Sequence, residues 1–139
     1  MQQEFELMFK RMREELTGIG IKELTTPADV ESELKDSKGT LLVFVNSVCG
    51  CAGGSARPGL AMALKNAKRP ERLTTVFAGQ DKEATAKARE FITDYAPSSP
   101  SAALFKDGKL VYFMPRHNIE GRTPQDVASQ LTTAFNQHC

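Results

Sequence analysis

The spacing of apolar residues along the chain predicts five helices. In each of them apolar side chains recur every three to four residues, the period of one helix face. The predicted helices cover 4–17, the segment after Thr26-Pro27, 55 to about 68 with Ala67 on its apolar face, the segment after Asp81 with Tyr95 on its apolar face, and the segment after Thr123-Pro124. Threonine caps well and proline suits a first turn, so both Thr-Pro pairs mark helix starts. Asp81 is expected to cap its helix, and Pro58 to kink its helix or mark the first turn.

Short apolar runs that lack this period predict strands between the helices. They cover 21–24, 40–46, 72–78, 101–106 and 109–114. Asp107-Gly108 separates the last two runs and is a strong signal for a tight hairpin. Strands that alternate with helices pair in parallel through right-handed crossovers, and a closing hairpin adds antiparallel strands. The fold class is therefore α/β, with a mixed central sheet of about four to five strands flanked by helices. We expect a single domain over 1–139 with an extra N-terminal helical extension over 1–20.

Composition and charge narrow the choice of partners. The chain has 139 residues, of which 40% are hydrophobic and 25% charged, with a net charge of +1. A nucleic-acid or anionic-membrane partner would call for a clear basic excess, so neither is expected. The first residues lack the basic and apolar regions of a signal peptide, and no apolar run is long enough to span a membrane. We therefore expect a cytoplasmic protein.

Candidate chemistry is concentrated in one thiol pair. Cys49 and Cys51, separated by Gly50, directly follow the apolar run 41–45 and precede the small-residue segment 52–55. A thiol at a helix start has a lowered pKa, and the thiolate is the nucleophile. A second thiol within reach can resolve a mixed disulfide formed by the first. This arrangement is typical of a thiol–disulfide oxidoreductase.

The short spacing of the two thiols limits their geometry. A fully extended two-residue step spans about 7 Å, beyond the usual Cα separation of a disulfide. Gly50 is expected to let the backbone fold back where a residue with a Cβ would resist. A disulfide closing so small a ring should be strained and easy to reduce, so we expect a more oxidising pair than in an ordinary thioredoxin.

Two plainer interpretations of the thiol pair remain open. The cysteines could be two unrelated buried thiols, or they could donate two ligands to a metal ion. Zinc usually requires four ligands, and His117, His138 and Cys139 offer no recognisable ligand spacing. No metal site is therefore expected. A non-catalytic binding or metal-binding module is the corresponding functional alternative.

Several motifs together resemble a known fold and family. A strand, a thiol motif, a kinked helix, and a proline before a hairpin follow the thioredoxin layout, in which 100–109 resembles the cis-proline strand and its turn. The Cys-Gly-Cys spacing departs from the usual Cys-x-x-Cys. The chain more narrowly resembles the bacilliredoxin family, through 46–52, 56–58, 76–85, 96–101, 115–121 and the terminal Cys139.

This resemblance implies a function and roles for the thiols. Bacilliredoxins are cytoplasmic thioredoxin-like proteins that remove bacillithiol, a small thiol, from S-bacillithiolated proteins, and weak disulfide isomerase or reductase activity is associated with them. The family pattern maps the attacking thiol onto Cys49 and the resolving thiol onto Cys51. The implied co-substrate is bacillithiol, with no bound cofactor, and the implied partners are S-bacillithiolated or disulfide-containing proteins and a reductase. Protein disulfide isomerisation is the alternative activity.

Other residues are candidates for substrate binding. We expect a cis peptide bond before Pro100, opposite the thiols, which would leave backbone groups of Ser99 and Ser101 free to pair with an incoming peptide or thiol. Arg57 could stabilise the thiolate or bind a carboxylate of the small thiol, or it could be a solvated surface arginine. Asn46 could orient a sulfur, as could the neighbouring serine, or simply end the strand.

His117 and Cys139 are the remaining auxiliary candidates. His117 follows the predicted hairpin beside Arg116 and has an intrinsic pKa suited to a proton shuttle, although a structural bond to a loop carbonyl is the commoner role of such a histidine. Cys139 ends the chain, where it could be an auxiliary thiol, form an intermolecular disulfide, or be an unremarkable exposed thiol.

Overall fold

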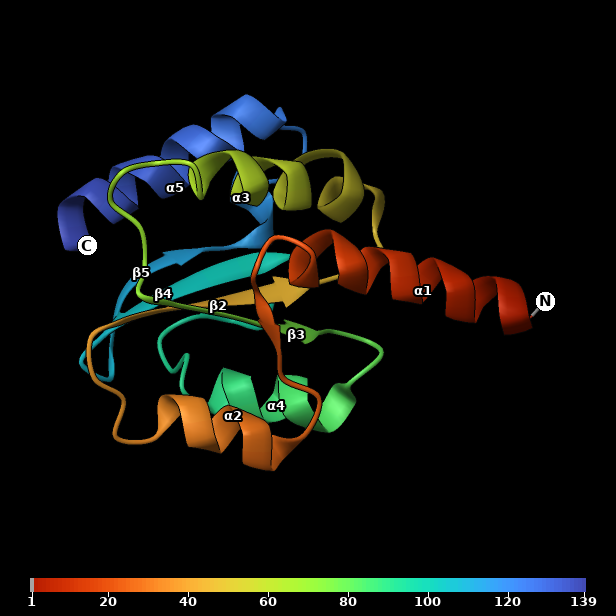
Figure 1. The fold of residues 1–139 in the computed structure, drawn as a ribbon, viewed down its shortest axis with the longest axis horizontal. Helices are drawn as coiled ribbons and strands as arrows, with labels where there is room; N and C mark the ends of the chain where they lie inside the picture. Colours follow the sequence, from red (N-terminus) through yellow and green to blue (C-terminus); the bar gives the residue numbers. More distant parts are fainter. Residues whose placement is uncertain (1) are drawn as a thin grey trace.

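The computed structural model describes residues 2–139, which form one five-stranded sheet covered by helices on both faces (Figure 1). The elements in chain order are α1 (Gln2–Thr17), β1 (Lys22–Glu23), α2 (Pro27–Leu34), β2 (Thr40–Asn46), η1 (Ala52–Ala56), α3 (Arg57–Ala63), β3 (Arg72–Phe77), α4 (Lys82–Glu90), β4 (Ser101–Lys106), β5 (Lys109–Met114), η2 (Arg116–Asn118) and α5 (Pro124–His138). Thr26 and Thr123 cap α2 and α5 through their side chains, as their Thr-Pro pairs predict.

The sheet is mixed, as the alternation of elements predicts. Its strand order is β1-β3-β2-β4-β5, with β1 and β2 parallel to β3, and β4 antiparallel to both β2 and β5. All seven residues of the central strand β2 are buried. The hairpin between β4 and β5 turns at Asp107 and Gly108, whose φ angles of 50° and 81° suit the residue pair that the sequence places there. These observations confirm the predicted fold class.

Successive residues of the sheet strands pack alternately in two separate hydrophobic cores, one on each face of the sheet. Leu42, Phe44 and Leu104 pack with α3, α5 and the end of α1, whereas Val43 and Phe105 on the other face pack with α2 and α4. Figure 1 shows α3 and α5 on one side of the sheet and α2 and α4 on the other. Successive side chains of β2 point to opposite faces of the sheet, and both faces are covered, so the strand is held in the centre of the fold. The thiol motif follows the carboxyl end of this strand.

Two predicted helices are shorter than the apolar pattern indicates. The helix predicted over 55–68 is instead a π-helical turn, η1, followed by α3, which ends at Ala63 and leaves Ala67 exposed. There the side chain of Asn66 bonds to the Lys68 carbonyl and stabilises a turn, an alternative to helix that asparagine favours.

The helix after Asp81 also ends early, at Glu90. Tyr95 lies beyond it, half exposed, with its ring 4.6 Å from that of Phe113, because an aromatic contact with β5 is available outside the helix. Pro58 lies in the first turn of α3, one of the two positions expected for it.

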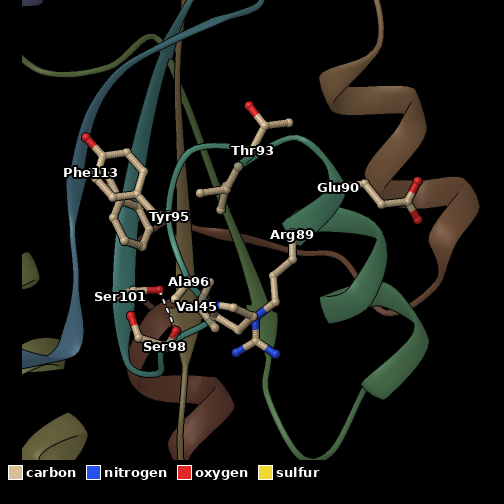
Figure 2. Close-up of a pocket in the computed structure, with 11 residues that line it drawn as sticks. Val45, Arg89, Glu90, Thr93, Tyr95, Ala96, Ser98, Ser101 and Phe113 are labelled. Atoms are coloured by element: carbon tan, nitrogen blue, oxygen red, sulfur yellow. Dashed lines mark hydrogen bonds between the residues drawn. The ribbon is translucent and has the colours of Figure 1, made fainter.

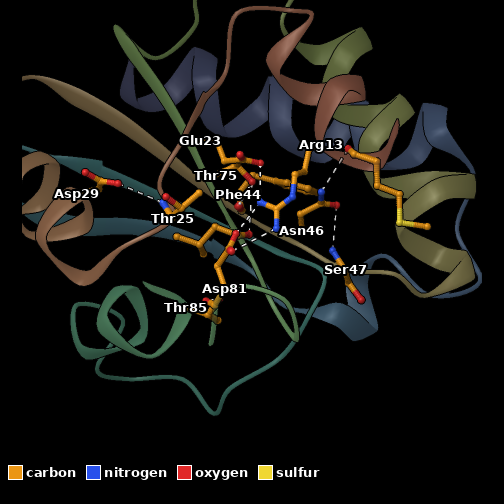
Figure 3. Close-up of polar contacts among 12 residues, drawn as sticks. Arg13, Glu23, Thr25, Asp29, Phe44, Asn46, Ser47, Thr75, Asp81 and Thr85 are labelled. Carbon is orange, nitrogen blue, oxygen red and sulfur yellow. Dashed lines mark hydrogen bonds and ion pairs between the residues drawn. The ribbon is translucent and has the colours of Figure 1, made fainter. Parts of the chain in front are cut away.

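Helix α1 is attached to the carboxyl edge of the sheet by ionic and aromatic contacts. The Arg13 guanidinium lies 2.6 Å from Asp81 and 2.9 Å from Glu23, and 4.9 Å above the ring of Phe77 (Figure 3). Asp81 is the N-cap residue of α4, as predicted, but its carboxylate is committed to Arg13 and makes no cap hydrogen bond to the helix. Among residues 2–139, no helix has the length and apolar character needed to cross a membrane.

Candidate active site

The thiol pair lies just beyond the carboxyl end of β2, where the chain enters a helical turn. The sulfurs of Cys49 and Cys51 are 2.7 Å apart, and both cysteines are free and partly exposed. Cys51 has helical angles, φ −69° and ψ −26°, and Gly50 is helical too. Helical angles bring Cα atoms two residues apart closer together than an extended backbone does, which brings the sulfurs of Cys49 and Cys51 together. The Cys-Gly-Cys spacing therefore gives a close thiol pair.

The role predicted for Gly50 is wrong. Its φ is not among the positive values of the chain, and a Cβ built on it would meet no atom within 4 Å. Any L residue can adopt this conformation, so the fold-back comes from the helical turn and not from the freedom of glycine.

The surroundings of Cys49 favour its thiolate. Partial burial alone would raise the pKa of Cys49, but hydrogen bonds from Cys51, the Ser47 hydroxyl and the Ala52 backbone N–H, together with the positive charge of Arg116, lower the pKa below the ordinary value of a thiol. The Cys49 N–H donates in turn to the Ser47 Oγ at 3.2 Å, which holds the two residues together.

Cys51 is shifted in the opposite direction. Burial raises the pKa of Cys51, and so do its hydrogen bond to Cys49 and the negative charge of the Cys49 thiolate, while Arg116 partly offsets these effects. Two neighbouring thiols cannot both ionise easily, so ionisation of Cys49 opposes ionisation of Cys51. The asymmetry agrees with the roles that the family pattern implies for the two cysteines.

Arg57 lies beneath the thiol loop and not on the surface. Its guanidinium is only 4% exposed; Nη1 donates to Asn46 Oδ1 and to the Ser47 carbonyl, each at 2.9 Å, and Nε donates to Glu15 at 3.1 Å. The expectation of a solvated surface arginine is therefore wrong. These bonds fix the backbone that leads into Cys49, so Arg57 is a positioning residue.

Asn46 completes this support from the end of β2. Its Oδ1 accepts from the Ser47 N–H at 2.9 Å as well as from Arg57, and its Nδ2 donates to the carbonyl of Met12 in α1 at 3.5 Å (Figure 3). Asn46 thus links the thiol loop to α3 and α1. It acts on the sulfur only through the loop that it holds.

The Ser99–Pro100 peptide bond is cis, as expected. Ser101 is buried at the start of β4 and its Oγ donates to the Ser98 carbonyl at 2.9 Å (Figure 2). The Ser99 carbonyl accepts from Arg116 Nη1 at 3.2 Å. One of the backbone groups expected to be free for an incoming peptide is therefore already engaged.

Arg116 is the site residue to which the sequence analysis gave no role. It opens η2 directly after β5, and its backbone N–H donates to the Ser98 Oγ at 3.2 Å, while Nε donates to Glu120 at 2.8 Å. Its charge acts on both sulfurs. The sequence signal that could have identified Arg116 is its place as the arginine of the 115–121 motif. This motif contacts the cis-proline loop only in the folded chain.

Two hollows share one wall, built from the 95–98 loop and β5. Both are lined by Tyr95, Ala96, Pro97, Ser98 and Phe113. The first, of ≈ 330 Å³, also reaches Val45 and Ser101 (Figure 2). The second, of ≈ 600 Å³, extends to Pro115, Arg116, His117 and Glu120, and is called the Arg116 groove below. This groove is the concave surface that contains the arginine acting on the thiols.

His117 and Cys139 lie in very different places. His117 is exposed on η2 and lines the Arg116 groove, with no side-chain hydrogen bond within residues 2–139. Cys139 lies near the hydroxyl of Thr40, at the amino end of β2, where burial raises the pKa of its thiol. The seven residues of β2 span about 23 Å, so Cys139 lies far from the thiol pair. Cys139 and Cys49 therefore make no contact within one chain, and an auxiliary role of Cys139 stays a prediction.

Potential metal ligands do not cluster around the thiol pair in the described residues 2–139. Within residues 2–139, no group of three or more His, Cys, Asp or Glu side chains has the proximity of a metal site. The residues around the pair instead supply hydrogen bonds and a positive charge, which are the contacts that favour a reactive thiolate.

Comparisons with known proteins agree with this site. A profile of the disulphide isomerase family matches residues 5–139. The chain is 54% identical over 128 residues to a bacilliredoxin of Halalkalibacterium halodurans, covering 92% of this chain and 89% of the relative. It is 55% identical over 130 residues to a bacilliredoxin of Bacillus cereus, covering 94% and 90% of the two chains.

Solved structures show the same fold at low identity. The thioredoxin of Fasciola hepatica superposes with a TM-score of 0.60 at 22% identity, covering 86% of this chain and all 100% of its own. Mitochondrial thioredoxin 3 of Saccharomyces cerevisiae gives a TM-score of 0.59 at 17% identity, covering 88% and 98%. The chain therefore belongs to the disulphide isomerase family whose named relatives are bacilliredoxins, and it is a thiol–disulfide oxidoreductase of thioredoxin fold.

Proposed function

We propose that this protein removes bacillithiol from S-bacillithiolated proteins, with Cys49 as the nucleophile and Cys51 as the resolving thiol. The observation that carries the proposal is the geometry of the pair: the two sulfurs lie 2.7 Å apart just beyond the end of β2, where Ser47 holds Cys49 and the pKa of the Cys49 thiol is lowered. The substrate comes from the named relatives, which are bacilliredoxins.

The first step is a thiol–disulfide exchange. The Cys49 thiolate attacks the bacillithiol sulfur of the mixed disulfide, so that a Cys49–bacillithiol bond forms and the bond to the protein sulfur breaks. The protein leaves as a thiolate, takes up a proton from solvent, and is released reduced. Because one disulfide replaces another, this step consumes no external oxidant or reductant.

The second step can follow two routes. In the dithiol route Cys51 loses its proton and attacks the Cys49 sulfur, which closes the Cys49–Cys51 disulfide and releases bacillithiol as a thiol. Burial, the largest cause of the raised pKa of Cys51, remains at this stage, but the charge of the Cys49 thiolate no longer adds to it, because Cys49 is by then a neutral disulfide. In the monothiol route a free bacillithiol thiolate attacks the cap on Cys49, which yields bacillithiol disulfide and regenerates Cys49. A reductase partner would supply the two electrons that reopen the dithiol disulfide.

The supporting residues keep Cys49 in place for in-line attack. Arg57 and Asn46 hold the loop from below, and Ser47 bonds to Cys49 directly. In the cis-proline loop Pro100 and Ser101 are buried, so Ser99, which is partly exposed, is the residue of the three that we expect to meet a substrate. His117 lines the same groove as Arg116, where it could relay a proton to a leaving thiolate.

Mass spectrometry of two matched variants tests the proposal. The Cys51→Ser protein, incubated with an S-bacillithiolated protein, should remove the cap in one turnover and accumulate bacillithiol on Cys49. The Cys49→Ser protein should leave the cap in place. Cap removal by Cys49→Ser, or an adduct on another sulfur of Cys51→Ser, would reverse the assignment.

A second activity, protein disulfide isomerisation, is favoured by one specific observation, the match to the family described as disulphide isomerase. The same thiolate can attack a non-native disulfide, and Cys51 can rescue the enzyme from a trapped mixed disulfide. Refolding of a scrambled disulfide protein, compared with cap removal at equal enzyme concentration, separates the two. Cap removal should be the faster reaction by at least about tenfold if the first proposal holds, equivalent to 1.4 kcal/mol in barrier height.

A further inference from the structure

We propose that Arg116 recognises a carboxylate on the small thiol of the mixed disulfide, and that the Arg116 groove holds the rest of that small thiol. The inference rests on the proposed function and assigns the part of the site that distinguishes the cap from an ordinary cysteine side chain. The ligand class is a low-molecular-weight thiol that carries a carboxylate.

The backbone and two guanidinium nitrogens of Arg116 are held by bonds to neighbouring segments. The backbone N–H bonds to Ser98 Oγ, Nη1 bonds to the Ser99 carbonyl, and Nε bonds to Glu120. Nη2 makes no hydrogen bond within residues 2–139, although arginine has five N–H donors. A guanidinium fixed on one side and open on the other is suited to receive an anionic ligand.

Arg116 is also within electrostatic reach of the reacting sulfurs. Its positive charge lowers the pKa of Cys49 and opposes the rise in the pKa of Cys51. The strand pairing gives the same placement: Arg116 lies two residues after the end of β5 and Cys49 three residues after the end of β2, and the start of β4 pairs with the ends of both strands. A small group bound to Arg116 would therefore lie at the edge of the sheet that carries the thiol pair.

The groove offers an apolar wall and a polar end. The ring centroids of Tyr95 and Phe113 lie 4.6 Å apart along the wall. Figure 2 shows the two rings next to each other on the side of the smaller hollow. Arg116 and His117 supply the basic groups at the other end, and Glu120 supplies one carboxylate. A volume of ≈ 600 Å³ is in the range of small-molecule sites.

The pair between Glu120 and Arg116 does not block the site. The two side chains are 60% and 43% exposed and lie four residues apart, which is the setting of a weak, easily exchanged ion pair. A ligand carboxylate can bind at Nη2 beside Glu120 or take the place of Glu120. Glu120 thus acts as an internal occupant that keeps the guanidinium oriented when no ligand is bound.

Arg57, the other arginine considered for carboxylate binding, is unsuited to it. Its side chain is only 4% exposed, and its Nε and Nη1 are used by Glu15, Asn46 and Ser47. A ligand carboxylate would have to reach a side chain that is almost closed to solvent. Arg116 is the arginine that combines an open donor with proximity to both thiols.

The test compares model caps of similar size and different charge. One reporter protein thiol is capped in turn with mercaptopropionate, mercaptoethanol or cysteamine, which are anionic, neutral and cationic, and kcat/KM for uncapping is measured. The readout is the ratio of the anionic to the neutral rate, because a change in the pKa of Cys49 affects both caps alike. Arg116→Gln should lower this ratio about fivefold, as expected for loss of an exposed ion pair.

Two control variants make the result specific. Arg122→Gln removes the same charge from an exposed arginine nearby and should leave the ratio unchanged. Arg116→Lys keeps the charge without the planar fork and should give an intermediate ratio. If Arg116→Gln lowers all three rates equally, the arginine acts only on the thiolate and the inference is overturned. A preference of the unaltered protein for the neutral cap that Arg116→Gln leaves unmoved would also overturn it, and would favour an apolar substrate side chain in the groove.

A fourth substrate separates this inference from the proposed function. The reporter capped with bacillithiol is assayed in parallel with the model caps. Removal of bacillithiol with an unaltered charge ratio in Arg116→Gln would leave the proposed function standing and overturn the role of Arg116. If the unaltered protein does not remove bacillithiol, and Arg116→Gln still lowers the ratio of anionic to neutral rates on the model caps, the proposed function is overturned and carboxylate recognition by Arg116 is supported.

Discussion

The buried guanidinium of Arg57 donates a hydrogen bond of 2.9 Å to the side-chain oxygen of Asn46. This contact joins the start of α3 to the end of β2, the two elements between which the thiol motif lies. A second bond of 2.9 Å from the same nitrogen to the Ser47 carbonyl extends the support by one residue toward Cys49. The reactive sulfur is therefore carried on a loop whose base is fixed from inside the protein.

Removing the Arg57 charge should destabilise the protein. Arg57→Met keeps much of the side-chain volume but leaves the Asn46 oxygen and the Ser47 carbonyl without their buried donor. We expect a loss of about 2–4 kcal/mol in the free energy of unfolding, measured by urea denaturation. The exposed Arg122→Gln variant is the control and should change stability by less than about 0.5 kcal/mol. An Arg57→Met protein as stable as the control would show that these bonds contribute little.

The residue at position 51 should control the acidity of Cys49. The hydrogen bond from Cys51 is the largest of the effects that lower the pKa of Cys49. Cys51→Ala removes the donor, whereas Cys51→Ser replaces it with a hydroxyl. We therefore expect the iodoacetamide rate of Cys49 to reach half its maximum at a higher pH in Cys51→Ala than in Cys51→Ser. Coincident pH profiles would mean that the contact between the sulfurs has no part in the ionisation of Cys49.

The thiols of the unaltered protein should differ in reactivity at neutral pH. The pKa of Cys49 is lowered, whereas those of Cys51 and Cys139 are raised, so near pH 7 a larger fraction of Cys49 is thiolate. Limiting iodoacetamide followed by peptide mass mapping should find label mainly on Cys49. The selectivity should shrink as the pH rises toward 10, because the other thiols then ionise as well. Label distributed equally at pH 7 would contradict the proposed nucleophile.

Two glycines near the site should respond in opposite ways to alanine. A Cβ on Gly59 would lie 2.6 Å from Val127 Cβ and 2.9 Å from the Pro124 carbonyl, where α3 packs against α5. Gly59→Ala should therefore cost about 1–3 kcal/mol in unfolding free energy. Gly50→Ala meets no neighbour within 4 Å and should leave stability unchanged or raise it by up to about 1 kcal/mol. Thermal unfolding of both variants checks the contrast, which would fail if Gly50→Ala were the less stable protein.

The terminal cysteine should be dispensable for turnover. Cys139 lies at the amino end of β2, at the edge of the sheet opposite the thiol pair. Cys139→Ser is expected to leave kcat/KM for cap removal within about twofold and to abolish any disulfide-linked dimer on non-reducing gels. A large loss of activity in this variant, measured with reduced monomeric protein, would require a role for Cys139 that its position does not provide.

Much of the fold follows from local sequence rules. The period-2 and period-3.6 patterns, the two Thr-Pro caps and the Asp107-Gly108 turn locate all five strands and the starts of α2 and α5. These signals are reliable because each depends on the preferences of a few adjacent residues. The ends of α3 and α4 are not predicted, because an asparagine turn and the contact of Tyr95 with Phe113 compete with helix continuation there.

The sequence by itself determined that this protein has a close pair of thiols at a strand–helix junction, because the motif and its flanking elements are local. Only the tertiary structure decided what surrounds the pair. Arg57 is turned inward as a support, Cys139 is placed at the far edge, and Arg116 is brought beside the sulfurs from a segment 65 residues after Cys51. The charge on a distant residue acts through space, and the distances that govern it exist only once β5 has paired with β4.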